Sequence, residues 1–209
     1  MGADHDFCSG FTRRPKSRLN KPWSAHHSPL YNIYSNDRND LWRFTLGKSG
    51  SRKLLTIGLN PSTATKENSD TTVAKVEGAA RRNGFDGFVM LNLYPVRSTD
   101  FTALPIGVDT EAFAENLRRI EEIVASEPNP VIWAAWGESI CKRGYFVDAG
   151  RELFARLQKY GPAWQHFGSL TNSGHPRHPS RLQYKWSFAH FDTRRYEQTL
   201  RTQPFGEIF

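Results

Sequence analysis

The sequence predicts an α/β fold of three layers, in which helices cover both faces of a central, mostly parallel sheet of four strands. Apolar runs too short for helices alternate along the chain with longer stretches of helical periodicity. Such alternation is typical of right-handed βαβ units, whose strands pair in parallel. The expected strands begin at Lys53, Phe88, Val131 and Trp164.

Residues 1–40 are expected to form an irregular basic N-terminal arm, followed by one domain over residues 41–209. The arm shows no hydrophobic periodicity and has too few apolar residues for a core of its own. Two interpretations stay open, a disordered tail or an arm that lies along phosphates. His26 and His27 lack ligand partners at metal-site spacing and are interpreted as loop residues. The basic residues of the arm include Arg13, Arg14, Lys16, Arg18 and Lys21.

The first elements of the domain are expected to be strands. Residues 41–46 alternate between apolar and polar side chains, which is typical of an edge strand or one leg of a hairpin. The apolar run from Lys53 is long enough for a buried strand. Gly58 permits an unusual backbone angle and Pro61 cannot lie in a central strand, so this strand ends there.

Helices are expected between the later strands. Ser69 or Asp70 is the natural N-cap of a helix that Gly84 ends. Thr110 is expected to cap another helix, whose apolar residues recur at the spacing of a core-facing stripe. A third spans residues 148–160. The stripe of the second helix consists of Phe113, Leu117, Ile120 and Val124. The aromatic and basic tail after Tyr184 is expected to cover the sheet.

Charge and composition narrow the class of protein. The net charge of +7 and the pI of about 9.6 fit a polyanionic partner, or a basic enzyme with a small anionic substrate. Cys8 and Cys141 are too few for a four-cysteine metal site or a disulfide framework. No apolar run reaches the length of a membrane span, and no signal-peptide pattern opens the chain. We expect a soluble, cytoplasmic monomer with no cofactor, metal cluster or membrane contact.

Four ordered motifs carry a resemblance to a known superfamily. A G-L-N-P sequence at residues 58–61 ends a strand, and an H-P-S-R-L sequence at residues 178–182 lies in a late polar loop. Between them, one apolar strand ends in Asn92 and another ends in the Trp-Gly pair at 136–137. This set resembles the uracil-DNA glycosylase superfamily, and the Asn in the first motif is most similar to the mismatch-specific branch. The chain also resembles a bacterial and phage family with L-N-P-S-T-A and G-H-P-R-H-P motifs.

The resemblance implies a uracil-DNA glycosylase-like sandwich and roles for the residues of the first motif. Asn60 would orient the hydrolytic water, with Gly58 and Leu59 beside the base. Ser62 stands where the uracil-specific branch has a bulky aromatic residue, so room is expected for groups at carbon 5 of a pyrimidine. Asn92 would read the base edge, because an amide both donates and accepts hydrogen bonds. A plain strand-end turn is the alternative for these residues.

The second motif is expected to supply a catalytic histidine and contacts to DNA. His178 would donate a hydrogen bond to the departing base, and Ser180 would bind a phosphate. Leu182 is either a wedge that fills the gap left by a flipped base or an ordinary core leucine. Arg177, Arg181 and Arg97 are expected at phosphates, and His175 is a candidate second donor.

The predicted function is that of a monofunctional DNA N-glycosylase. It would flip out a 5-substituted or otherwise modified pyrimidine and hydrolyse its N-glycosidic bond, in DNA repair or in defence against phage with modified DNA. Two alternatives stay open. One is a catalytically silent module on the same fold that binds nucleic acid or nucleotides. The other is a hydrolase or transferase that acts on free nucleosides or nucleotides.

Overall fold

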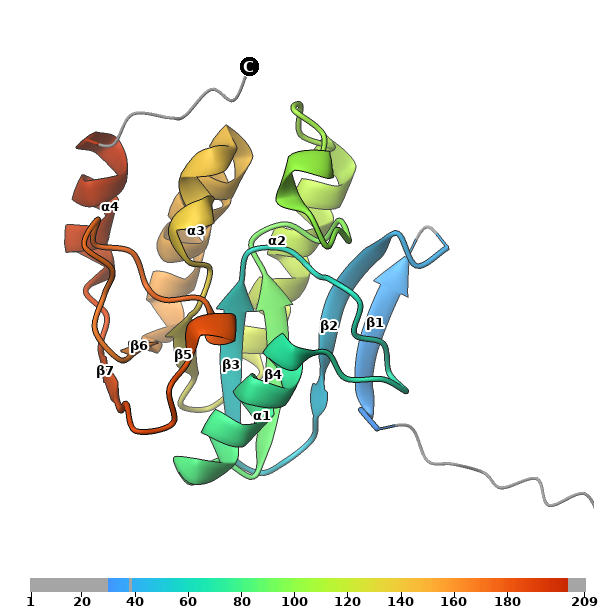
Figure 1. Ribbon diagram of the computed structural model, residues 1–209, viewed down its shortest axis with the longest axis vertical. Coiled ribbons are helices and arrows are strands. Elements are labelled where there is room, and N and C mark those ends of the chain that lie inside the picture. Colours follow the sequence, from blue (N-terminus) through green and yellow to red (C-terminus); the bar gives the residue numbers. More distant parts are fainter. Residues whose placement is uncertain (1–29, 38, 203–209) are drawn as a thin grey trace, which may run out of the picture.

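Four apolar strands form the centre of the structure, a computed structural model that describes residues 30–37 and 39–202. They lie in the order β4, β3, β5, β6 and pair in parallel (Figure 1). Burial on both faces explains why their sequences are nearly continuous apolar runs. The predicted α/β class is confirmed. The four strands are β3 (Lys53–Gly58), β4 (Gly87–Asn92), β5 (Val131–Ala134) and β6 (Ala163–Phe167).

The predicted sheet of four strands is wrong, because the sheet formed by the described residues has seven strands and is antiparallel at both ends. β2 (Trp42–Lys48) pairs with β4, and β1 (Ile33–Asp37) pairs with β2. At the other end β7 (Phe188–His190) pairs with β6. β1 and β7 are short and contain polar residues, and their conformation depends on pairing with a neighbour more than on hydrophobic pattern. β2 is an inner leg of a hairpin and not an edge strand, because β1 pairs with its outer side.

The boundary of the expected N-terminal arm is also corrected. β1 lies inside the segment expected to be irregular, and Tyr31 before it is buried with 1% of its surface exposed. Tyr31 packs edge-on against Phe88 of β4, so this part of the segment belongs to the domain. The basic cluster of the expected arm, the histidine pair at 26–27 and Cys8 lie outside the described residues.

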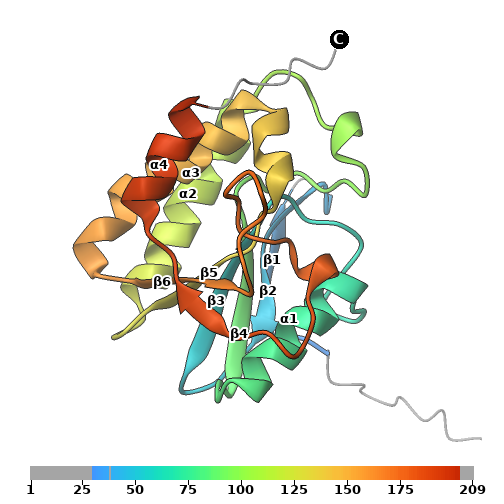
Figure 2. The ribbon, with the colours of Figure 1, turned by 60° about the vertical axis from the view of Figure 1, so that its left-hand side comes forward.

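Helices cover both faces of the sheet, but unequally (Figures 1 and 2). α1 (Thr71–Arg82) lies alone on one face, against β3 and β4. The opposite face carries α2 (Thr110–Ala125), α3 (Gly144–Leu157) and α4 (Thr193–Thr202), and α3 packs between the other two. Each face has its own cluster of buried apolar side chains. On the α1 face, the segment after β6 covers what the single helix leaves open.

The helix boundaries follow from local capping. Asp70 caps α1, since its carboxylate accepts a hydrogen bond from the Val73 N–H at 2.8 Å. Asp109, not the expected Thr110, caps α2 by accepting from the Ala112 N–H at 3.0 Å. α3 begins earlier than expected, at Gly144, because Tyr145 and Phe146 bury their rings in the core.

Candidate functional site

A cavity of about 890 Å³ opens at the carboxyl ends of β3 and β5. Its walls are the loops after β3, β4 and β5, the first turn of α1, and the segment after β6. α/β sheets bind ligands at this edge, and pockets of roughly 300–1,000 Å³ are typical of ligand sites. Asn60 and His178, which are far apart in the sequence, both line this cavity.

Asn60 is held in one orientation by two backbone carbonyls. Its Nδ2 donates to the carbonyl oxygens of Pro61 at 3.1 Å and Ser98 at 3.0 Å. Because both N–H groups are used in this way, the amide oxygen Oδ1 is left as an acceptor. The side chain is half-buried at the cavity wall. This arrangement suits an acceptor for a water or for a ligand N–H group.

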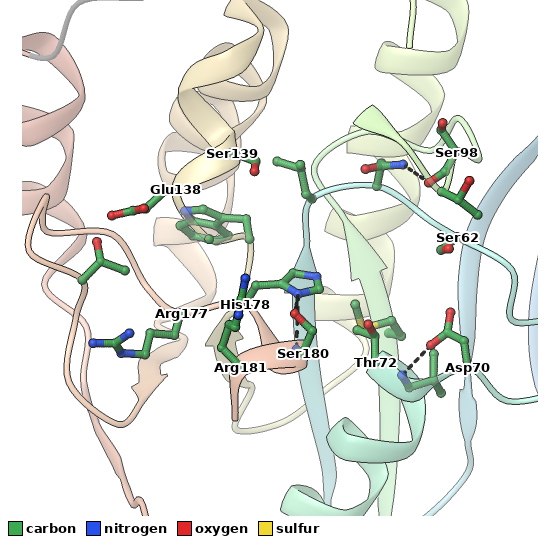
Figure 3. Close-up of a pocket in the computed structure, with 18 of the residues that line it drawn as sticks. Ser62, Asp70, Thr72, Ser98, Glu138, Ser139, Arg177, His178, Ser180 and Arg181 are labelled. Atoms are coloured by element: carbon green, nitrogen blue, oxygen red, sulfur yellow. Dashed lines mark hydrogen bonds between the residues drawn. The ribbon is translucent and has the colours of Figure 1, made fainter. Parts of the chain in front are cut away.

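His178 is a neutral imidazole whose tautomer is fixed by its own loop. Its Nδ1 accepts hydrogen bonds from the Ser180 hydroxyl at 2.8 Å and from the Ser180 N–H at 3.3 Å. The ring hydrogen therefore lies on Nε2, which is left as a donor. Burial lowers the pKa of His178 to about 4, so the ring is uncharged at neutral pH. In Figure 3, His178 and Ser180 lie between Arg177 and Arg181 on one side and Asp70 and Thr72 on the other.

Gly137 explains why the strand that precedes it ends in Trp-Gly. Its backbone has φ of +76°, a region that other residues rarely adopt. A Cβ atom at this position would lie 3.1 Å from the Cβ of His178. Gly137 therefore permits the close approach of the histidine loop to the end of β5.

Asn92 is buried at the end of β4, where its side chain lies beside that of Met90. Its side chain is 1% exposed, and neither its Nδ2 nor its Oδ1 has a hydrogen-bond partner. A Cβ atom on Gly58 would lie 2.6 Å from the Met90 methyl and 3.0 Å from the Asn92 Oδ1, so these two groups meet above Gly58. Met90 lines the cavity, and Asn92 does not. The amide expected to read a base is thus present and unpaired, but covered by a flexible thioether.

Of the other residues expected near a base, Leu59 and Ser62 line the cavity. Leu59 is nearly buried, and the small Ser62 side chain is partly exposed. Gly58 contributes through its missing side chain, because any Cβ there would displace Met90 or Asn92.

Three of the residues expected to contact DNA lie at the cavity, namely Arg177, Ser180 and Arg181. The Arg177 Nε donates to the carbonyl of Ser169 at 2.8 Å, and its guanidinium lies 5.4 Å from the ring centroid of Trp186. Ser180 and Arg181 are exposed. The two arginines bring positive charge to this side of the cavity, where Glu138 also lies.

The loop that carries His178 is fastened to α1. The Nζ of Lys75 donates to the carbonyl of Ser180 at 2.7 Å. Further along, the Arg82 guanidinium lies 3.9 Å from the ring centroid of Tyr184. Gly78 leaves room for Tyr184, whose hydroxyl would lie 2.6 Å from a Cβ there.

The structure places the remaining predicted residues elsewhere. Leu182 is buried in the α1-face core with 8% exposure, so the expected wedge is wrong and the core interpretation is correct. His175 is 2% exposed, and its Nδ1 lies 2.7 Å from the Tyr196 hydroxyl, inside the opposite core. Arg97 donates to the carbonyls of Ser62 and Ala64 and is ion-paired, so it braces the loop after β3 instead of facing a phosphate.

The cavity residues that sequence reasoning missed include Arg43, Asp70, Glu138 and Trp186. Asp70 was recognisable as a helix cap, but not as a wall of the site. Arg43 stands in an alternating strand, where a charged residue is ordinarily assigned to the solvent face. Within residues 30–37 and 39–202, no three His, Cys, Asp or Glu side chains are grouped as metal ligands. No helix in the same ranges is long and apolar enough to cross a bilayer.

Comparison with known proteins gives one match. A family described as proteins of unknown function, DUF1643, matches residues 38–180, well over half of the chain. The chain belongs to DUF1643. The matched range contains Asn60, Asn92 and His178, and it ends just before Arg181. Neither the curated proteins nor the solved structures contain a match.

Proposed function

We propose that this DUF1643 protein is a DNA N-glycosylase that removes a modified pyrimidine and leaves an abasic site. The observation that carries the proposal is that an oriented amide oxygen, on Asn60, and a neutral imidazole donor, on His178, share one cavity. Cleavage of a glycosidic bond needs a placed water on the sugar side and a donor for charge on the departing base. The superfamily resemblance of the two motifs supports the same assignment.

Asn60 has the chemistry to orient the water but not to deprotonate it. The oxygen of an amide accepts a hydrogen bond, whereas a carboxylate also accepts a proton. The rate of bond cleavage therefore depends on how well the departing base is stabilised. His178 would contribute more to this rate than Asn60. A neutral imidazole with its hydrogen on Nε2 donates without adding a charge to the site before the reaction.

The size and floor of the cavity support a substituted pyrimidine. Ser62 lines the cavity with a small side chain, and about 890 Å³ is more than enough for a bare pyrimidine ring. Asn92 would pair with the base edge once Met90 moves aside, since the unpaired amide is already at hand. Arg177 and Arg181 would face the phosphates of the DNA strand.

The test is base release from duplex oligonucleotides that carry a single uracil, thymine or 5-hydroxymethylpyrimidine. Alkali cleaves the strand wherever an abasic site has formed. We expect cleavage at the 5-substituted base, and a loss of roughly 100-fold or more in Asn60→Ala and in His178→Ala. DNA binding, measured by fluorescence anisotropy, should change little in either variant.

Matched controls are Asn68→Ala and His190→Ala, which remove an exposed asparagine and an exposed histidine outside the cavity. Both should keep wild-type release. Absence of abasic sites from every substrate would contradict the proposal. Release of uracil alone would contradict the assignment of a 5-substituted base, and equal loss of binding and release would favour a silent binding module.

One observation favours a second candidate, a hydrolase or transferase of free nucleosides or nucleotides. Such an enzyme needs no side chain that fills a gap in duplex DNA, and Leu182 is buried in the core. The same assay with nucleosides and nucleotides, read by chromatography of the freed base, separates the two candidates. Faster release from the monomers than from duplex DNA would support the second.

A further inference from the structure

Arg43 is a buried charged residue in the wall of the cavity. Its side chain is 2% exposed. Among the described residues the guanidinium donates one hydrogen bond, from Nη1 to the carbonyl of Ala64 at 3.0 Å, and its Nε is buried without a partner. No carboxylate in the described part of the chain forms an ion pair with it. A buried charge with so few partners costs stability, unless something outside the protein pairs with it.

A β-bulge turns Arg43 toward the cavity. Ser35 of β1 pairs with Thr45, and the next residue, Asn36, pairs with Arg43, so Phe44 is an extra residue in β2. In a regular strand Phe44 and Leu46 would share a face, yet Phe44 packs in the core under α2 and Leu46 in the core under α1. The bulge therefore puts Arg43 on the α1 face, where the cavity lies. Bulges are known to re-aim side chains beside functional sites.

The groups around Arg43 are those that hold an anionic oxygen. α1, a helix of 12 residues, begins at the cavity. Thr72 in its first turn and Ser62 in the loop after β3 both line the cavity and carry hydroxyl groups. Figure 3 shows Ser62, Asp70 and Thr72 together on this side. The positive end of the helix dipole favours an anion there.

The carboxylate of Asp70, which also lines the cavity, already accepts hydrogen bonds from two backbone N–H groups. Asp70 accepts from the Val73 N–H at 2.8 Å with Oδ1 and from the Ala64 N–H at 3.3 Å with Oδ2. Arg97, the other nearby guanidinium, is ion-paired with Asp40 at 3.1 Å. Burial lowers the pKa of Arg43 to about 10, which leaves the guanidinium charged at neutral pH.

We propose that Arg43 and the first turn of α1 form a subsite for an anionic oxygen group of the ligand, a phosphate or a carboxylate. Two sources share this chemistry: the phosphate of a nucleotide, or an anionic group carried by the base itself. The second source fits the side of the cavity where Ser62 leaves space. The subsite requires binding only and does not depend on bond cleavage.

The primary test is binding of inorganic phosphate, measured by calorimetry and by the shift in unfolding temperature. We expect the wild type to bind, and Arg43→Met to raise the dissociation constant by at least about tenfold, the effect of losing one charge-assisted hydrogen bond. As a control, Arg195→Met removes an exposed arginine outside the cavity and should change the dissociation constant by less than about threefold. Equal effects of the two variants, or no binding by the wild type, would overturn the proposal.

The source of the anion is identified with nucleosides. Deoxycytidine 5′-monophosphate is compared with deoxycytidine, and 5-carboxydeoxycytidine is compared with the same nucleoside. If the 5′-monophosphate binds more tightly than deoxycytidine and the difference is lost in Arg43→Met, the subsite holds the phosphate. If 5-carboxydeoxycytidine shows this behaviour, the subsite holds an anionic group on the base. If neither anion gains over deoxycytidine, the proposal fails.

Stability without any anion separates ligand binding from a structural role. If Arg43 serves to bind an anion, its buried charge lowers the stability of the protein when no anion is bound. Arg43→Met should then leave the urea midpoint unchanged or raise it. An arginine that mainly braces the loop after β3 through Ala64 should lower it when replaced. A lowered midpoint together with unchanged phosphate binding would overturn the proposal, whether or not the protein cleaves DNA.

Discussion

Each face of the sheet buries an asparagine close to the end of β4, and the two amides have opposite environments. Asn116 of α2 donates through Nδ2 to the carbonyls of Asn92 at 2.9 Å and Leu93 at 3.2 Å. Asn92 itself points to the other face, where its side chain has no hydrogen-bond partner. The Asn116 amide therefore stabilises the strand end through Nδ2, although its Oδ1 has no partner, whereas neither side-chain atom of Asn92 has a partner among the described residues.

This difference extends to the faces as wholes. The face under α2, α3 and α4 is a large apolar cluster in which aromatic rings pack edge to face. Within the described residues both faces bury polar atoms without partners, and on the α1 face one of them, the Nε of Arg43, lies in the cavity wall. Buried unpartnered groups cost free energy, so a ligand that paired with Arg43 would offset part of that cost. The others on the α1 face belong to Thr56, Asn92 and Trp133.

The largest expected effect is on the apolar face. Phe146 of α3 is fully buried and contacts Tyr94 and Tyr145. Phe146→Ala should lower the free energy of unfolding by about 3–5 kcal/mol. The substitution removes the transfer free energy of the buried ring and leaves a cavity whose walls lose packing contacts. Urea denaturation followed by tryptophan fluorescence measures the loss. The folded fraction should still bind phosphate as the wild type does, and a loss below about 1 kcal/mol would show that this face is not the main source of stability.

The two buried asparagines should respond in opposite directions to the same substitution. Asn116→Leu removes two hydrogen bonds to the end of β4 and should cost about 1–3 kcal/mol. Asn92→Leu replaces an unpaired amide by an apolar group of similar size and should leave stability unchanged or raise it. Both are measured in the same urea titration. If Asn92→Leu destabilised the protein as much as Asn116→Leu, the contrast between the faces would be unfounded.

The smallest effect expected is the pH dependence that His178 contributes. The pKa of this ring is lowered by burial to about 4 in the folded protein, from 6.5 when exposed. The unfolded chain therefore binds the proton first, and stability falls as the pH drops from about 6.5 to about 4, then levels off. Partial exposure of the ring limits the loss to about 1 kcal/mol. His178→Gln should lack this component when urea midpoints are compared between pH 7 and pH 4, and identical profiles would contradict the buried neutral ring.

The central strands and α1 could be predicted because their signals are local. Short apolar runs, Gly58 and Pro61 at a strand end, and an Asp70 cap need no tertiary information. β1 and β7 could not be predicted in the same way, because three to five mixed residues become strands only beside a partner.

Site residues could be predicted where a sequence motif follows the end of a strand. They could not be predicted where tertiary packing determines the direction of the side chain. Asn60 and His178 reach one cavity because the loops after parallel strands share an edge. Arg43 depends on a bulge that leaves no mark in the sequence. Leu182 follows a loop, where the sequence alone does not distinguish a wedge from a core residue, and the buried position was decided by the space under α1.

The attachment of the histidine loop to α1 has a mechanical consequence. Lys75 and Arg82 hold this loop from a helix that is itself seated on β3 and β4. Displacing α1 would carry the imidazole with it, while Asn60, in the loop after β3, is held by the carbonyl of Ser98. A shift of α1 would thus change the distance between the two groups. Salt, which weakens the contacts of exposed charges, would loosen the attachment of the loop to α1.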